Sequence, residues 1–105
     1  MTTAFPHPPA TMTAMGIAPT VHASRYLQQL CQHWSGSCAV DFDPTAGHIA
    51  LPLGQIDLSA GDMALLVTCT PHAPDDLHRM QRVVGDHLDR LASREGPLVW
   101  HWGRC

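Results

Sequence analysis

Apolar side chains recur every three to four residues in two stretches of the chain, a spacing typical of amphipathic helices. Thr20 precedes the first stretch as a candidate N-cap, and Gly96-Pro97 follows the second as a helix terminator. The pattern therefore predicts two helices, each with one buried face. The apolar positions are Ala23, Tyr26, Leu27, Leu30, Cys31 and Trp34 in the first stretch, and Leu77, Met80, Val83, Val84, Leu88, Leu91 and Ala92 in the second.

Shorter stretches alternate between apolar and polar residues, as half-buried strands do. Turn-forming residues such as Asp43-Pro44, Gly54 and Gly61-Asp62 separate them. The pattern predicts an α+β fold, with an antiparallel sheet of about five strands and both helices packed on one face. Four of these strands form a meander and the fifth is C-terminal. Their inward or apolar positions are Val40 and Phe42; Ile49, Leu51 and Leu53; Ile56 and Leu58; the run 63–70; and Leu98, Trp100 and Trp102.

The N-terminal segment is different, because residues 1–15 hold Pro6, Pro8 and Pro9 and show no periodicity. We expect this segment to be a disordered tail and residues 16–105 to form a single α+β domain. The segment lacks the basic residues and apolar core of a secretory signal. No apolar run approaches the roughly 18–20 residues that span a bilayer. A cytoplasmic protein without a membrane span is therefore expected.

Composition narrows the range of functions. The chain has 105 residues, and its 6 basic residues, all arginine, stand against 9 acidic ones. A nucleic-acid-binding protein normally has a basic face, so we expect no such partner. The cysteines Cys31, Cys38, Cys69 and Cys105 form no C-x-x-C pair, which disfavours a redox or zinc motif. Cys31 and Cys69 fall on apolar faces, where we expect reduced thiols that pack as small hydrophobes.

Motifs that would identify an enzyme are absent from the sequence. It has no Walker loop, G-x-G-x-x-G, G-x-S-x-G or H-E-x-x-H. An enzyme is therefore not indicated, and we assign no catalytic residue, cofactor or metal set. Cys31 and His33 lie two apart on a helix and point in different directions. A metal site would have to combine one of them with His87 or His101 across the fold.

Two segments resemble a known family. The segments 23–34, ASRYLQQLCQHW, and 87–95, HLDRLASRE, are similar to the opening and closing motifs of a small bacterial family, domain of unknown function 2218. The resemblance spans about residues 17–102. It implies no established activity, but it suggests an iron-handling context, beside flavin-dependent ferric-siderophore reductases. The chain departs from the family where Gly36 replaces a second histidine, and where Leu91 and Ser93 replace phenylalanines.

Six residues are candidates for ligand binding. His33 and His87 lie on or beside the apolar helix faces, where each ring either satisfies its nitrogens with a carbonyl or carboxylate or faces the other as a ligand or acid–base pair. Trp34 and Trp100 form a core aromatic cluster with Trp102, or a ligand platform or subunit interface. Arg25, beside Tyr26, either binds a carboxylate with its fork of donors or pairs with an acid. The candidate acids are Asp86, Asp89 and Glu95.

These observations leave three functions open. The first is a non-catalytic binding or accessory module, which engages a protein partner or small ligand in a groove near His33, His87 and the tryptophans. The second is a structural homodimer that pairs sheet edges or an apolar face. The third is a small enzyme that uses His33 and His87 as acid and base.

Overall fold

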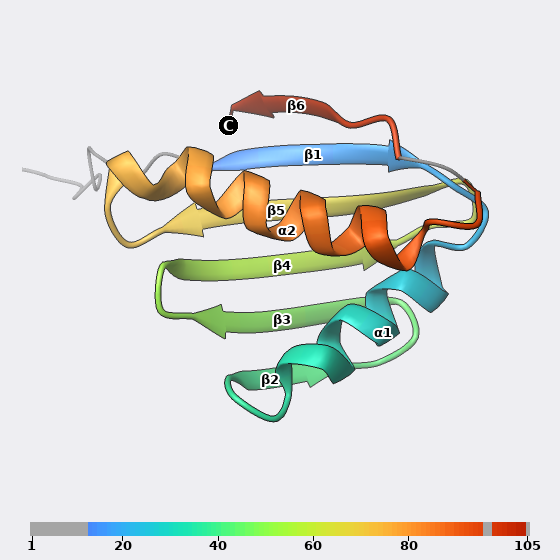
Figure 1. Cartoon of the computed structure of the whole chain (residues 1–105), viewed down its shortest axis with the longest axis horizontal. Coiled ribbons are helices and arrows are strands. Elements are labelled where there is room, and N and C mark those ends of the chain that lie inside the picture. Colours follow the sequence, from blue (N-terminus) through green and yellow to red (C-terminus); the bar gives the residue numbers. More distant parts are fainter. Residues whose placement is uncertain (1–12, 96–97, 105) are drawn as a thin grey trace, which may run out of the picture.

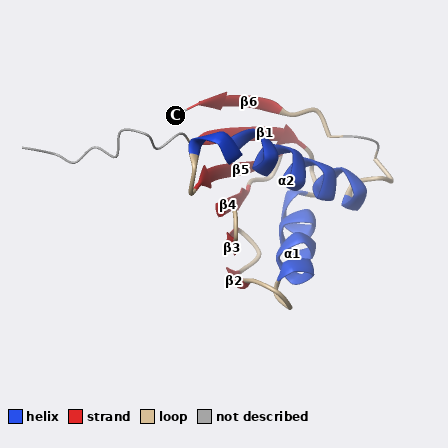
Figure 2. Cartoon of the chain, turned by 60° about the vertical axis from the view of Figure 1, so that its left-hand side comes forward, coloured by secondary structure: helices blue, strands red, loops and turns tan. Residues whose placement is uncertain are grey.

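The computed structural model describes residues 13–95 and 98–104. It has an antiparallel sheet of six strands, with two α-helices on one face (Figures 1 and 2). The α+β prediction is confirmed, with one strand more than the expected five. The elements are β1 (Ala14–Pro19), α1 (Ala23–Trp34), β2 (Ala39–Phe42), β3 (Ala46–Leu51), β4 (Gly54–Ala60), β5 (Ala64–Pro71), the 3₁₀ turn η1 (Pro74–Asp76), α2 (Leu77–Leu91) and β6 (His101–Arg104).

The strand order is β2-β3-β4-β5-β1-β6. The predicted meander is therefore present as the four consecutive strands β2 to β5. After it, the chain forms α2 and returns to the sheet as β6, which pairs with β1 rather than with β5. Figure 1 shows β1 lying between β5 and β6, so the first and last strands are neighbours.

β1 is the element that the sequence pattern did not predict. The expected tail reached residue 15, but Ala14 and Met15 belong to β1; residues 1–12 lie outside the described part. The core-facing positions of β1 are Ala14, Gly16 and Ala18, all of them buried. These side chains are too small to give a visible apolar alternation, which explains the missed strand.

β6 begins later than predicted. The alternation suggested a strand over 98–102, whereas the paired residues are His101–Arg104. Within it, Trp102 lies opposite Gly16 of β1. A Cβ atom on Gly16 would lie 2.7 Å from the Trp102 ring, so the indole covers the bare backbone of the glycine. The missing side chain of Gly16 is thus the space that Trp102 fills.

The two helices match their predicted spans. α1 occupies 23–34 as expected, and its N-cap residue is His22 rather than Thr20. The Thr20 hydroxyl nevertheless accepts a hydrogen bond from the His22 amide at 3.1 Å, so it stabilises the entry to the helix. α2 ends at Leu91, before Gly96 and Pro97, which lie outside the described residues.

The core lies between the helices and the sheet. Leu30 of α1 and Val84 of α2 are both fully buried in one cluster, so the two apolar faces share a single interior. Cys31 and Cys69 lie in this cluster, and burial raises the pKa of their thiols to about 11 and about 12 respectively. Both behave as the packed hydrophobes that the sequence indicated. No helix in the described part of the chain is long and apolar enough to cross a membrane.

Candidate functional site

His33, Trp34 and His87 meet between the end of α1 and the third turn of α2. The ring centroids of His33 and His87 are 5.1 Å apart, and those of Trp34 and His87 are 4.8 Å apart. Trp34 and His87 are half-buried, while His33 is exposed. The structure therefore brings three of the six predicted binding residues into one cluster, which we call the imidazole cluster.

The hydrogen bonding of His87 fixes which of its nitrogens is available. Its Nδ1 lies 2.7 Å from the carbonyl oxygen of Val83. A carbonyl oxygen can only accept, so Nδ1 carries a proton and donates. In the neutral ring the lone pair then resides on Nε2. His87 thus bonds a backbone carbonyl through Nδ1, which is one of the two alternatives predicted for it. Its other ring nitrogen, Nε2, remains for a ligand.

Trp100 does not join the imidazole cluster. Its ring stacks on Trp102, with centroids 5.3 Å apart and planes at 21°. All three tryptophans pack against the one core, as one alternative predicted, but no aromatic contact links Trp34 to the stacked pair within the described residues. Trp100 lies over Gly85 of α2, and its buried Nε1 has no hydrogen-bond partner among the described groups.

Tyr26 serves as a structural link instead of an open ligand. Only 4% of the residue is exposed, and its hydroxyl donates to Glu95 Oε1 at 2.5 Å. Thr20 donates to the same oxygen at 2.7 Å. Burial raises the pKa of Tyr26, with the Glu95 carboxylate adding to the effect. The two hydroxyls lower the pKa of Glu95, so the carboxylate stays ionised and joins the chain before α1 to the segment after α2.

Arg25 is exposed on α1 and lines a separate pocket with Tyr26. The expected ion pair with Asp86, Asp89 or Glu95 is not formed, since the only ion pair within the described residues joins His48 to Asp57. Arg25 and Tyr26 are therefore brought to one site, distinct from the imidazole cluster.

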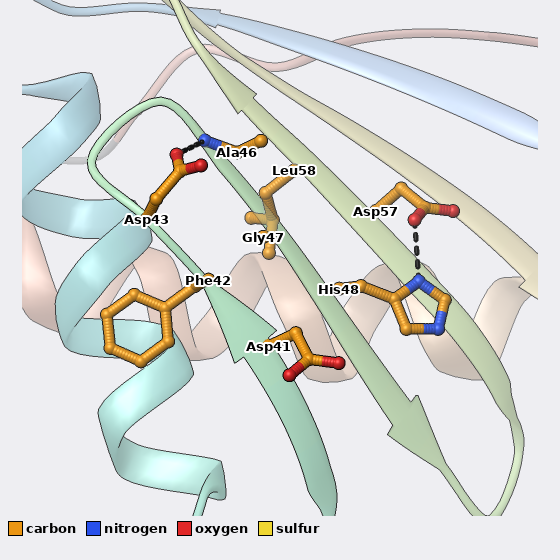
Figure 3. Close-up of a pocket in the computed structure, with 8 residues that line it drawn as sticks. All are labelled: Asp41, Phe42, Asp43, Ala46, Gly47, His48, Asp57 and Leu58. Carbon is orange, nitrogen blue, oxygen red and sulfur yellow. Dashed lines mark hydrogen bonds and ion pairs between the residues drawn. The ribbon is translucent and has the colours of Figure 1, made fainter.

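The face of the sheet opposite the helices carries a row of polar residues that the sequence did not reveal. Asp41, His48 and Asp57 are successive cross-strand neighbours on β2, β3 and β4. Figure 3 shows the His48 ring directed to Asp57, with the Asp41 carboxylate on its other side. His48 Nδ1 lies 2.7 Å from Asp57 Oδ1, and this bond raises the pKa of His48.

This row borders a shallow pocket of about 500 Å³. Asp43 at its rim is already engaged, because its Oδ1 accepts from the amides of Thr45 and Ala46. No group of three or more metal-ligating side chains occurs within the described ranges 13–95 and 98–104. The sequence contains one signal for this row, because each of its three residues is a polar position in a stretch that alternates between apolar and polar residues. Finding their alignment required the strand register, which the pattern does not supply.

Comparisons with known proteins agree with this fold. A family model described as an uncharacterised protein conserved in bacteria (DUF2218) matches residues 15–103. The NMR structure of PA4090 from Pseudomonas aeruginosa is similar at 30% sequence identity and a TM-score of 0.74, and the match covers 88% of this chain and 95% of that one. No curated protein matches the chain.

Proposed function

The chain belongs to the DUF2218 family of uncharacterised conserved bacterial proteins, and within that family we propose that it is a non-catalytic binding module whose imidazole cluster takes a divalent transition-metal ion. The observation that supports this function is the 5.1 Å separation of the His33 and His87 rings, which come from two different helices. Trp34 lies beside them as a half-buried wall.

The separation suits two imidazoles on one ion. Zinc–nitrogen bonds are about 2.0–2.1 Å long, which places each ring centre roughly 3 Å from the metal and two ligating rings at most roughly 6 Å apart. The Nδ1 bond of His87 to a backbone carbonyl is the kind of outer contact that orients a ligating histidine. His33 is exposed and is free to turn its ring toward the same point.

Two protein ligands leave coordination positions for water or a bound chelator. Imidazole suits zinc, copper, nickel and ferrous iron, whereas ferric iron prefers oxygen ligands. Ferrous iron is thus among the ions that this site favours, which accords with the iron-handling context that the family resemblance suggests. The module would hold or pass on a metal without transforming a substrate.

The test is a titration of untagged protein with Ni²⁺, in which binding is measured by calorimetry and by tryptophan fluorescence. We expect one saturable site, with fluorescence quenched because Trp34 lies within a few ångströms of the ion. H33A and H87A should each weaken binding at least tenfold, and W34F should keep the heat of binding while losing most of the quenching. H78A removes an exposed histidine of α2 and is the matched control. Equal binding by H33A, H87A and H78A would refute the site.

Self-association is a second candidate function, supported by an exposed apolar patch at one end of the sheet. Val21, Met63 and Val99 are 66%, 70% and 64% exposed, and Ile17 of β1 is 39% exposed. The Thr20 amide donates to the Met63 carbonyl at 3.0 Å, which brings the first two of these residues together. Such patches are often covered in an oligomer. Light scattering should then give a dimer that V21D converts to a monomer, whereas a wild-type monomer at high concentration would contradict this role.

A further inference from the structure

A pocket of about 390 Å³ lies where the start of α1 meets the segment that follows α2. Figure 1 shows the two helices approaching one another at this corner of the molecule. The volume falls in the range of small-molecule sites. The pocket is lined by Arg25, Tyr26 and Gln29 from α1, and by Leu91, Ser93 and Arg94 from the end of α2 and the turn after it.

The two arginines of this pocket have no acidic partner. Neither Arg25 nor Arg94 forms an ion pair with any residue that the structure describes. The nearest acid in sequence, Glu95, directs one carboxylate oxygen to the hydroxyls of Tyr26 and Thr20. The first turn of α1 also contains no acidic residue. Two guanidinium groups therefore line one hollow without a carboxylate that neutralises either of them.

We propose that this pocket binds a small oxyanion, either a carboxylate or a phosphate group, between Arg25 and Arg94. A guanidinium presents paired donors that match the two oxygens of such a group. The Gln29 amide lies one helical turn from Arg25 on the same face of α1 and can donate alongside it. Ser93 offers a hydroxyl on the opposite side, and Leu91 gives the pocket an apolar wall. This arrangement favours an anion attached to a small organic body.

The proposal does not depend on the metal site. Arg25 and His33 are eight residues apart on α1, or about 12 Å along the helix axis. The two sites thus lie at opposite ends of α1 and share no residue. A failure to bind metal would therefore not contradict the anion pocket, and a failure to bind anions would not contradict the metal site.

The experiment is an amide NMR titration of the full chain with inorganic phosphate and, separately, with citrate, at constant ionic strength set with sodium chloride. We expect saturable shifts concentrated at Gln29, Ser93 and their sequence neighbours. R25Q and R94Q should each weaken binding at least tenfold. R25K keeps the charge without the fork of donors, and it should bind more weakly than the wild type. R82Q, on the exposed face of α2, is the matched control and should bind as the wild type does.

The two anions distinguish the source of the ligand chemistry. Binding of phosphate alone would support a phosphate-bearing ligand, and binding of citrate alone would support a carboxylate. The proposal is overturned if neither anion gives saturable shifts. It is equally overturned if R25Q and R94Q bind with wild-type affinity, because any shifts would then arise from general charge. Both arginines are exposed, so loss of folding is not expected to obscure the result.

Discussion

Replacing Gly54 with alanine is expected to lower the free energy of unfolding by about 4 kcal/mol. Gly54 begins β4 at a φ of +155°, a backbone conformation that residues with a side chain rarely adopt. A Cβ atom there would lie 2.3 Å from the Thr70 carbonyl oxygen and 2.6 Å from the Pro71 Cα atom. Backbone strain of about 1–3 kcal/mol adds to an overpacking cost of similar size. The colliding atoms belong to the backbone of β5, so they cannot turn aside.

Urea denaturation of the wild type and G54A measures this effect. G36A is the matched control, because a Cβ atom on Gly36 would meet nothing within 4 Å. We expect G36A to stay within about 0.5 kcal/mol of the wild type. If G54A unfolds at the same urea concentration as G36A, the close approach of β4 to the end of β5 is wrong.

The second large effect is expected for Leu30→Ala, which should destabilise the protein by about 3–5 kcal/mol. Leu30 is fully buried in the cluster that also contains Val84 of α2. Truncating its side chain removes buried apolar surface and leaves a cavity where α1, α2 and the sheet meet. The loss is a large fraction of the roughly 5–15 kcal/mol that stabilises a typical domain.

The same denaturation experiment provides two comparisons for Leu30. L30M keeps the side-chain volume and should cost less than about 1.5 kcal/mol. Q32A alters an exposed residue of the same helix and should have an effect near zero. A small loss for L30A, close to that of Q32A, would show that the two helices do not share one interior.

Most of the fold could be predicted because its core-facing residues are large. Leu27, Leu30 and the other buried residues of α1 give a clear helical period, and Ile56 and Leu58 mark β4 in the same way. β1 could not be predicted in this way, because Ala14, Gly16 and Ala18 face the core with almost no side chain. The space over Gly16 is filled by Trp102, a residue distant in sequence. A pattern along one segment does not show what another segment supplies.

The candidate sites also differ in how far the sequence could predict them. The sequence placed His33 and His87 on or beside the buried faces of two helices, and the packing of those helices brought the rings together. Arg94, by contrast, lies beyond the apolar positions that predict the second helix, and no pattern in the sequence singles it out. It becomes a partner of Arg25 only because the chain turns after Leu91. Pairing across elements depends on the angle between helices and on strand register, which local periodicity does not encode.

The position of β1 has a consequence for synthesis on the ribosome. Among the described helices and strands β1 is synthesised first, yet its two neighbours are β5 and β6, with Ala14 opposite both Cys69 and Arg104. Each strand from β2 to β5 pairs with its neighbour in the chain, so these hairpins can form as soon as both strands are available. The backbone groups on both edges of β1, by contrast, have no native partner until β5 and β6 have been made. Closing such a long loop is slow, so the final assembly of this domain should take milliseconds or longer rather than microseconds. Until β5 has been synthesised, β1 is exposed to chaperones and to misplaced pairing with other chains.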